Sequence, residues 1–221
     1  MRDYDWSVIG RAGDLLMAAT RLTVGLFAGS LVLATVLGLI LALMRLSPIA
    51  PLRWVSATYV WILRGIPVFV TLLFAFFVAR DLPGLGWLTP IWAGVLGLGI
   101  DGAAYKAEII RAGVMAVDPG QYEASEALGM TKAHYMRTIV IPQSIRVIVP
   151  TYMSNSILLL KATSVAVGIG LVELTGITRQ LSNSTNRLVE LFTAAAVIYL
   201  VLTTVLVLLQ EFLERRFALK T

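Results

Sequence analysis

The chain has 221 residues, of which 58% are hydrophobic and 14% are charged, and its mean hydropathy is +0.83. Soluble domains carry about 25% charged residues, so this composition is that of a membrane protein. Cysteine is absent, which excludes disulfides and thiolate metal sites, and a single histidine, His134, does not favour a histidine metal cluster. The net charge of +5 is compatible with a nucleic-acid partner, but basic cytoplasmic loops of a membrane protein account for it. We therefore expect a membrane protein with no metal site and no nucleic-acid partner.

The first 21 residues are charged along their length and contain no long apolar core, so we expect no cleaved signal peptide there. The charged residues are Arg2, Asp3, Asp5, Arg11, Asp14 and Arg21. Membrane targeting then depends on the first spanning helix.

Five apolar runs follow, each close to the roughly 20 residues that a spanning helix needs. They lie at about 22–44, 54–79, 83–108, 147–172 and 191–212. No repeat with a period of about 20–50 residues is visible. The predicted fold is an all-α membrane protein with five transmembrane helices and one domain over residues 1–221. An odd number of spans places the two termini on opposite sides of the membrane.

The distribution of positive charge indicates the orientation, because basic residues gather in cytoplasmic segments. With the N-terminus outside, the inner segments hold Arg45, Arg53, Lys106, Arg111, Lys132, Arg137, Arg146, Arg215, Arg216 and Lys220. The outer loops hold only Arg80, Arg179 and Arg187, and the arginines of the N-terminal segment are matched by aspartates. The sequence thus predicts an outer N-terminus, a cytoplasmic C-terminus and a long cytoplasmic loop at 106–146.

This long loop contains the signals of two short helices. Asp118 is a helix cap, Pro119 suits the first helical position, and Gln121 is placed as a capping-box partner. Gly129 permits the left-handed turn that ends the first helix, and Thr131 can cap the second. From these residues alone, the segment is either a hairpin that joins two spans or a docking element for a cytoplasmic partner.

The residue pattern of the loop decides between these two interpretations. Glu123, Ala124, Gly129, Ile139 and Pro142 lie at the spacing E-A-A-x3-G-x9-I-x-L-P. This pattern resembles the cytoplasmic signature of the permease subunits of binding-protein-dependent ABC importers, with Ser125 in place of the second alanine and Ile141 in place of leucine. The stretches "AYKAEIIRAGVMAVDPGQYEASEALGM" and "YVWILRGIPVFV" resemble the polar amino acid importers of the histidine, arginine and glutamine type. The resemblance runs from about residue 15 to 217.

The resemblance implies a complex in the bacterial inner membrane. Residues 119–141, within a coupling segment at 118–142, would form coupling helices that press into an ATPase subunit, present in two copies. The other implied partners are a second permease (the same chain or a sister subunit), an extracytoplasmic binding protein, membrane lipid and a polar amino acid substrate. ATP and magnesium would be bound by the ATPase, and no cofactor is expected in this chain.

Two motifs depart from the pattern of the family that the sequence resembles. "RGIP" usually reads Arg-Gly-Thr-Pro and "KATS" usually reads Lys-Asp-Thr-Ser, so Ile66 and Ala162 are departures. The position that matches Asp101 is commonly polar and uncharged in the family, whereas Glu173 matches the glutamate of its "ELT" motif. Both acids are expected to line a central cavity.

The glycines at 97–102, "GLGIDG", match G-x-G-x-x-G, but they lie inside an apolar span. Close helix packing through small residues explains them better than nucleotide binding. The sequence contains no G-x-x-x-x-G-K-[ST], so we expect that the chain is not an ATPase by itself.

Charged residues inside the spans are the main candidates for the substrate site, because each costs about 2.5–3.5 kcal/mol at the bilayer centre. Arg64, Asp101 and Lys161 fall near the middle of spans, and Glu173 falls at the outer end of the fourth. Asp101 and Glu173 are expected to hold the ammonium group of an amino acid. For Arg64 and Lys161 two alternatives stay open, namely pairing with acids or backbone carbonyls inside the protein and contact with substrate.

Three further residues complete the predicted site. Gly65, together with Pro67, should break the second helix and expose backbone groups that hold a substrate carboxylate or serve gating. Thr23 and Ser164 are weaker candidates, because hydroxyls in spans more often bond to their own helix.

Two other functions are compatible with parts of the sequence. An ion-coupled secondary transporter would use Asp101 and Glu173 for protons, but the odd span count and the missing inverted repeat argue against it. A membrane scaffold that docks a cytoplasmic partner has no need of charged residues inside its spans.

Overall fold

The computed structural model describes residues 4–217, which are built from helices and connecting loops and contain no strand. The α-helices are α1 (Ser7–Leu46), α2 (Ala50–Gly65), α3 (Val68–Leu73), α4 (Pro90–Met115), α5 (Pro119–Ala127), α6 (Lys132–Tyr135), α7 (Ile141–Ala162), α8 (Leu174–Thr185) and α9 (Leu188–Phe217). Two π-helical segments, Phe74–Val78 and Met136–Val140, and two 3₁₀ segments, Ala79–Asp81 and Thr163–Ile169, extend α3, α6 and α7.

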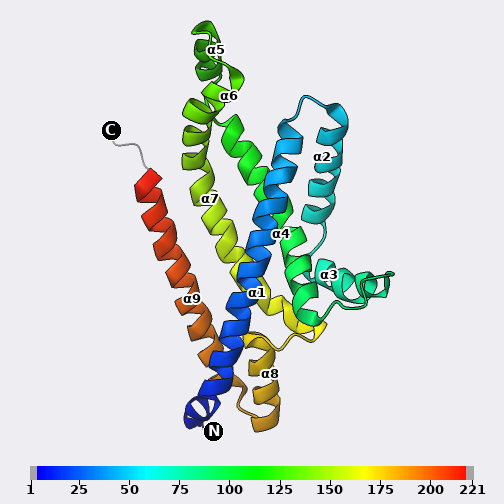
Figure 1. Cartoon of the computed structure of the whole chain (residues 1–221). Coiled ribbons are helices and arrows are strands. Elements are labelled where there is room, and N and C mark those ends of the chain that lie inside the picture. Colours follow the sequence, from blue (N-terminus) through cyan, green and yellow to red (C-terminus); the bar gives the residue numbers. More distant parts are fainter. Residues whose placement is uncertain (1–3, 218–221) are drawn as a thin grey trace.

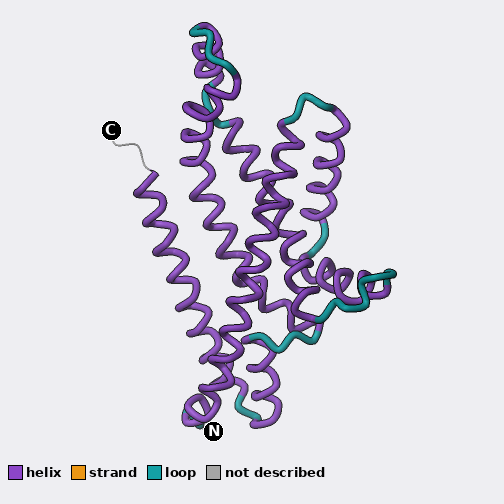
Figure 2. Tube along the Cα trace, in the orientation of Figure 1, coloured by secondary structure: helices purple, strands orange, loops and turns teal. Residues whose placement is uncertain are grey.

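The long helices run side by side, and α4 lies among them (Figure 1). α4 packs against α1, α2, α3 and α7. The hairpin of α5 and α6 forms one end of the molecule, whereas the described N-terminal residues and α8 lie at the opposite end. Most connections are short, and the longest loop joins the α3 region to α4 (Figure 2).

α1 is much longer than the predicted span at 22–44. It has 40 residues, from Ser7 to Leu46. At 1.5 Å per residue its length is about 60 Å, roughly twice the hydrocarbon thickness of a bilayer. The charged first turns of α1 therefore continue the same helix beyond the apolar run.

The second predicted span, 54–79, is broken where the sequence analysis expected a break. α2 ends at Gly65, Ile66 and Pro67 are extended, and α3 begins at Val68. The helix direction bends by 106° between Ala50–Gly65 and Val68–Val78. Pro67 lacks the backbone N–H that a continuous helix would need at this position. α3 thus points away from the bundle (Figure 1).

Within residues 4–217, three helical stretches are long and apolar enough to cross a membrane, or four if the bent α2–α3 pair counts as one span. The three are Ser7–Leu46, Lys132–Ile169 and Leu188–Phe217. α4, in the third predicted span (83–108), is not among them. Its helix begins only at Pro90, and it carries four charged residues, Asp101, Lys106, Glu108 and Arg111. Because protein surrounds it, α4 does not need the apolar surface of a lipid-facing helix.

The last two predicted spans differ from the structure at their ends. The fourth, 147–172, corresponds to α7, which begins earlier, at Ile141, and gives way to the 3₁₀ segment Thr163–Ile169. Gly170, with φ of 80°, ends that segment in the left-handed region. The fifth, 191–212, lies within α9, which extends to Phe217.

Glycines on α4 and α1 bring the central helices close together, as expected for "GLGIDG". A Cβ atom on Gly99 would lie 2.6 Å from Leu33 of α1, and one on Gly97 would lie 2.9 Å from Leu72 of α3. Gly38 of α1 is equally confined, because its Cβ would lie 2.6 Å from Lys106 Cβ and 3.1 Å from the Ala103 carbonyl oxygen. The α1–α4 contact therefore depends on small residues from both helices.

Replacing Gly38 tests this contact. Gly38→Ala should lower the thermal midpoint of the purified chain in detergent, because an extra methyl group in a packed contact costs about 1–3 kcal/mol. Gly25→Ala, on the same helix, is the matched control, since no atom lies within 4 Å of its added Cβ. Equal midpoints for the two variants would contradict the close approach of α1 to α4.

Candidate functional site

A cavity of about 450 Å³ lies at the bend between α2 and α3. Residues of the bend, of α4 and of α7 line it: Arg64, Gly65, Ile66, Pro67, Val68, Asp101, Gly102, Tyr105, Asn155, Leu158, Leu159 and Ala162. The structure thus brings together three predicted site residues, Arg64, Gly65 and Asp101. The volume suits a small polar molecule.

Asp101 is the acidic group of this cavity. Its residue surface is 9% exposed, and its carboxylate forms no hydrogen bond and no ion pair with any residue between 4 and 217. A carboxylate withdrawn from water without a protein partner is costly, so it favours a cationic ligand.

Arg64 is the basic group of the same cavity. Its guanidinium carbon lies 5.5 Å from the centre of the Tyr105 ring, within the range of a cation–π contact. No carboxylate of the described chain lies within ion-pair distance of Arg64. Asp101 and Tyr105 are four residues apart on α4, so they share one helix face.

A second cavity, of about 600 Å³, continues the first toward the hairpin of α5 and α6. Both cavities are lined by Arg64, Tyr105, Asn155 and Leu158. The second also reaches Glu108, whose carboxylate pairs with Arg111 and, at 4.0 Å, with Arg45. The two cavities therefore form one groove between α4 and α7, and Arg64 and Tyr105 lie at its middle.

Glu173 and Thr23, two other predicted site residues, lie together away from this groove. Glu173 is fully buried and accepts hydrogen bonds from the backbone N–H groups of Thr175 and Gly176, both at 2.9 Å, and from the Tyr199 hydroxyl at 3.0 Å. It caps the N-terminus of α8. The Thr23 hydroxyl accepts the Leu174 N–H at 3.0 Å and so joins α1 to α8.

Lys161 and Ser164 line a separate groove of about 520 Å³ beside α9. Tyr199 and Thr175 line it as well, so Glu173 lies directly behind its wall. The Ser164 hydroxyl donates to the Lys161 carbonyl at 2.7 Å, which is the bond within its own helix region that the sequence analysis set against a substrate role. Lys161 forms no ion pair with the described residues.

The loop between α4 and α7 forms the two expected short helices. Asp118 caps α5, and its carboxylate accepts the Gly120 N–H at 2.7 Å. Gln121 does not return the capping-box bond, because its side-chain oxygen accepts instead from Gln143 at 3.5 Å. Gly129 ends the first helix with φ of 70°, as predicted. Thr131 holds the cap position of α6, but its hydroxyl makes no capping bond.

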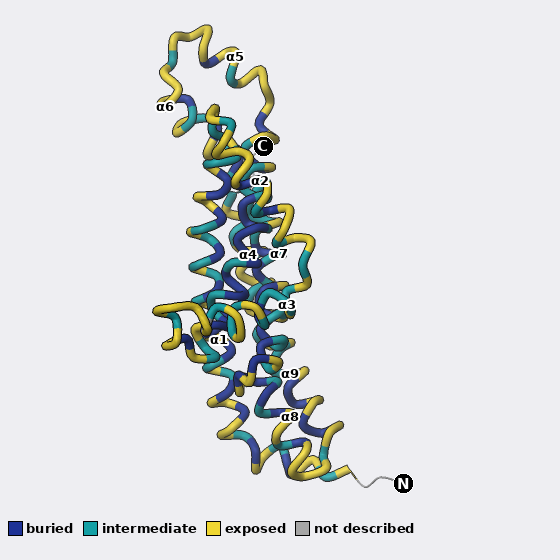
Figure 3. Tube along the Cα trace, turned by 90° about the vertical axis from the view of Figure 1, so that its right-hand side faces the viewer, coloured by how far each residue is buried: buried dark blue, intermediate teal, exposed yellow. Residues whose placement is uncertain are grey.

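The predicted coupling residues divide into an outer and an inner group. Glu123, Ala124, Gly129 and Pro142 are exposed. Ser125 is buried and donates to the Gln121 carbonyl at 2.6 Å, and Ile139 packs on a small cluster of Val117, Tyr135 and Val140. Leu128, 80% exposed, adds an apolar side chain to the outer surface. The hairpin is exposed around most of its surface (Figure 3), so it presents its outer residues away from the bundle.

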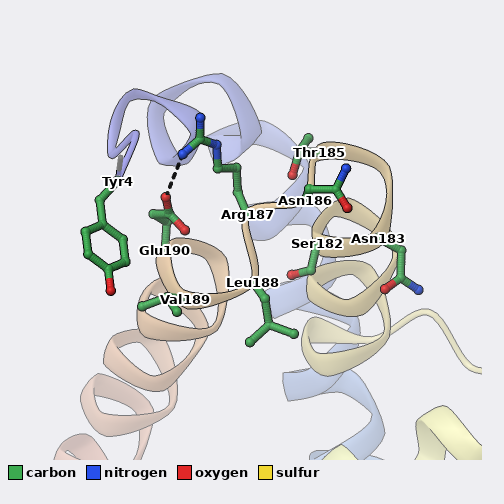
Figure 4. A pocket seen from close by; sticks show the side chains of 9 residues that line it. All are labelled: Tyr4, Ser182, Asn183, Thr185, Asn186, Arg187, Leu188, Val189 and Glu190. Atoms are coloured by element: carbon green, nitrogen blue, oxygen red, sulfur yellow. Dashed lines mark hydrogen bonds and ion pairs between the residues drawn. The ribbon is translucent and has the colours of Figure 1, made fainter. Parts of the chain in front are cut away.

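A further pocket, of about 860 Å³, lies at the opposite end of the molecule. Side chains from the end of α8 and the start of α9 surround it, together with Tyr4 (Figure 4). Glu190 fixes the N-terminal segment there, because its carboxylate accepts the Asp5 N–H at 2.9 Å and lies 3.4 Å from Arg187. Hydrogen bonding from Ser7 holds the pKa of the Asp5 carboxyl below its ordinary value.

Comparison with known proteins identifies the family. Residues 34–219 match the family described as the binding-protein-dependent transport system inner membrane component. The chain belongs to this family. It is therefore a multi-pass component of the inner membrane, and it is not itself an ATPase.

Individual relatives agree with this assignment. The chain is 34% identical to the probable amino-acid permease protein YxeN of Bacillus subtilis over 97% of this chain and 96% of the relative. It is 39% identical to the arginine transport system permease protein ArgU of Corynebacterium glutamicum over 88% of this chain and 66% of the relative. A crystal structure of an amino acid ABC transporter with histidines matches with a TM-score of 0.89 and 35% identity, over 97% of this chain and 100% of the other.

Three residues of this inner membrane component were not among the predicted site residues but have defined places in the structure: Tyr105, Asn155 and Lys106. Tyr105 and Asn155 line both halves of the groove, and the spacing of four residues from Asp101 was the signal for Tyr105. Lys106 was counted among the basic residues of the cytoplasmic loop, but the structure buries it completely within α4. α4 continues to Met115, so the loop begins later than the charge count assumed.

Proposed function

We propose that this chain is the transmembrane subunit of an ATP-driven, binding-protein-dependent importer of polar amino acids or close analogues. The observation that carries the proposal is the continuous groove between α4 and α7, which runs from the Asp101 cavity toward the exposed hairpin of α5 and α6. The names of the relatives support the substrate class, since two are amino acid permeases.

The groove offers complementary groups to a free amino acid. The Asp101 carboxylate suits an ammonium or guanidinium group, and the Arg64 guanidinium suits a carboxylate. Gly65 contributes the break between α2 and α3 at which the cavity lies. Thr23, Glu173, Lys161 and Ser164 remain predicted substrate residues, but their contacts support this role less well. Glu173 and Thr23 already form hydrogen bonds within the protein, at the junction of α1 and α8.

Three of the five departures from the family pattern line the same cavity, whereas Ser125 and Ile141 belong to the coupling segment. Ile66, Ala162 and Asp101 line this cavity together. The sequence thus lacks an acid at 162, where the pattern that it resembles usually has one, and carries an acid at 101, where that pattern is usually uncharged. We infer that α4 supplies the carboxylate that α7 usually supplies.

The proposed topology has five spans, an outer N-terminus and a cytoplasmic C-terminus. α4, the third span in chain order, would also cross the membrane, and its neighbouring helices would protect it from lipid. The described end of α9 and the α1–α2 connection lie toward the hairpin end of the molecule, opposite the N-terminal end (Figure 1). Arg2, Asp3 and Lys220, which entered the charge count, lie outside the described residues.

The proposed complex contains two such permease chains, identical or sister subunits, above two ATPase subunits, with a binding protein delivering substrate from outside. The ATPases would bind ATP and magnesium. Closure of the ATPases would move α5 and α6 and turn the cavity outward. The coupling residues proposed to contact the ATPase are Glu123, Ala124, Ser125, Gly129, Ile139 and Pro142.

Single cysteines test the topology, because the native chain has none. With an impermeant thiol reagent applied to intact cells, a cysteine at Ser184 should be labelled and one at Lys132 should not. Permeabilised cells, in which both cysteines should react, provide the control. Labelling of Lys132→Cys in intact cells would reverse the orientation and remove the hairpin from the cytoplasm.

Replacing Gly129 tests coupling. Gly129→Val forces a β-branched residue into the left-handed region at a cost of about 1–2 kcal/mol, so ATP-driven uptake should be lost although the chain still inserts. Gly129→Asn is the matched control, because asparagine tolerates this backbone conformation, and it should retain most of the uptake. Normal uptake by a well-expressed Gly129→Val complex would refute the coupling role of this turn.

Reconstitution with the ATPase and the loaded binding protein tests the function and the role of Asp101 together. Wild-type proteoliposomes should take up substrate only with ATP, whereas uptake driven by an ion gradient alone would indicate a secondary transporter. Asp101→Asn should reduce uptake about tenfold or more, which corresponds to roughly 1.4 kcal/mol for a lost charge-assisted hydrogen bond. Adding Ala162→Asp to Asp101→Asn returns a carboxylate to the cavity and should recover part of the uptake.

Asp14→Asn is the control for this series, because Asp14 is exposed on the first turns of α1. It removes a carboxylate without touching the groove, so its uptake should match that of the wild type. If Asp101→Asn transports as well as Asp14→Asn, Asp101 is not part of the substrate site.

A further inference from the structure

Lys106 is the largest fully buried side chain among residues 4–217, with an exposed fraction of 0%. It lies on α4, one residue beyond Tyr105, and does not line either cavity of the groove. No carboxylate of the described residues lies within ion-pair distance of its Nζ atom. A lysine placed at this depth needs other polar partners, and it is a functional candidate by default.

All the partners of the Lys106 head group belong to α7. Nζ donates to the Tyr152 carbonyl at 3.0 Å and to the Ser156 hydroxyl at 2.6 Å, and it lies 3.5 Å from the centre of the Tyr152 ring. Ser156 in turn donates to the same Tyr152 carbonyl at 2.7 Å. One side chain thus fastens α4 to one turn of α7 by two hydrogen bonds and an aromatic face.

α1 supports this junction from the other side. The Tyr152 hydroxyl is hydrogen-bonded to Thr35 of α1. Gly38, one turn further along α1, lets the backbone of α4 approach at Lys106, since a Cβ there would lie 2.6 Å from Lys106 Cβ. The three helices therefore meet at one polar junction, formed by Lys106, Tyr152, Ser156 and Thr35.

The junction joins the two helices next to the hairpin, so it can affect whether they move together. α4 leads into the α5–α6 hairpin and α7 leads out of it, so the two helices that Lys106 joins are the two that carry the coupling segment (Figure 1). Along α4, Lys106 lies between Asp101 of the cavity and the hairpin. A displacement of the hairpin reaches the cavity as one movement only if α4 and α7 do not slide past each other.

We propose that Lys106 is a positioning residue that locks α4 to α7, so that both helices transmit the movement of the coupling segment to the Asp101 cavity as one body. The inference rests on the proposed function of the chain as an importer subunit. It assigns to Lys106 no contact with substrate or with the ATPase. Replacing Lys106 should uncouple ATP hydrolysis from transport, whereas the substrate and the ATPase subunits should still bind.

The test compares the number of ATP molecules hydrolysed per substrate imported by the reconstituted complex. Lys106→Met keeps the length of the side chain and removes its donors. The ratio should rise by about two- to thirtyfold, the range over which residues between coupled sites alter coupling. Arg216→Met, which removes an exposed positive charge at the end of α9, is the control and should leave the ratio unchanged.

Ser156→Ala is the second variant. It removes the 2.6 Å bond from Lys106 and the 2.7 Å bond from Ser156 to the Tyr152 carbonyl, but it leaves Lys106 its own bond to that carbonyl. It should therefore raise the ratio by less, and adding it to Lys106→Met should have little further effect, because the two residues act through one contact. It also decides the test if Lys106→Met fails to assemble. An unchanged ratio in the assembled variants, even with a lower thermal midpoint, would show that Lys106 only stabilises the fold. Absence of ATP-driven uptake in the wild type would instead refute the importer function.

Discussion

The rest of the structure depends on keeping α4 out of contact with lipid. This helix carries two acids, two bases and a series of glycines, and no bilayer would accept it alone. It is tolerated because α1, α2, α3 and α7 enclose it. The enclosure requires close approach, which the small residues of α1 and α4 provide. The charged residues that make α4 a poor lipid-facing helix also suit it to line a path for a charged solute.

The groove and the hairpin are therefore two ends of the same pair of helices. α4 and α7 line the cavities and continue toward the α5–α6 hairpin, so the same two helices reach both regions. The residues on the two faces of α4 are specialised accordingly. Asp101 and Tyr105 face the groove, whereas Lys106 is directed into the contact with α7. One residue along α4, from Tyr105 to Lys106, separates a side chain that lines the groove from one that contacts α7.

The sequence was sufficient for features that depend on local chemistry. The break at Pro67, the cap at Asp118 and the left-handed turn at Gly129 follow from one or two residues each, and the structure has all three. Asp101 and Arg64 line the same cavity, whereas the sequence left open whether Arg64 pairs inside the protein or contacts substrate. Features that depend on contacts between residues far apart in the sequence could not be predicted from it. Glu173 and Thr23 are occupied by an α1–α8 junction between residues 151 positions apart, which no local pattern reveals. Lys106 lies where the predicted span at 83–108 overlaps the predicted loop at 106–146, and the structure places it buried within α4. Hydropathy alone cannot distinguish a polar helix inside a bundle from a polar loop outside it.

The 106° bend has a consequence for the electrostatics of the cavity. α2 ends at Gly65, which lines the cavity, so the carbonyl groups of its last turn have no following N–H groups in the same helix to bond. The aligned peptide dipoles of a helix place about half a negative elementary charge at such an end. This charge belongs to the backbone and does not titrate. Attraction for a cation in the cavity would thus keep one part that is independent of pH, even when the protonation of Asp101 changes.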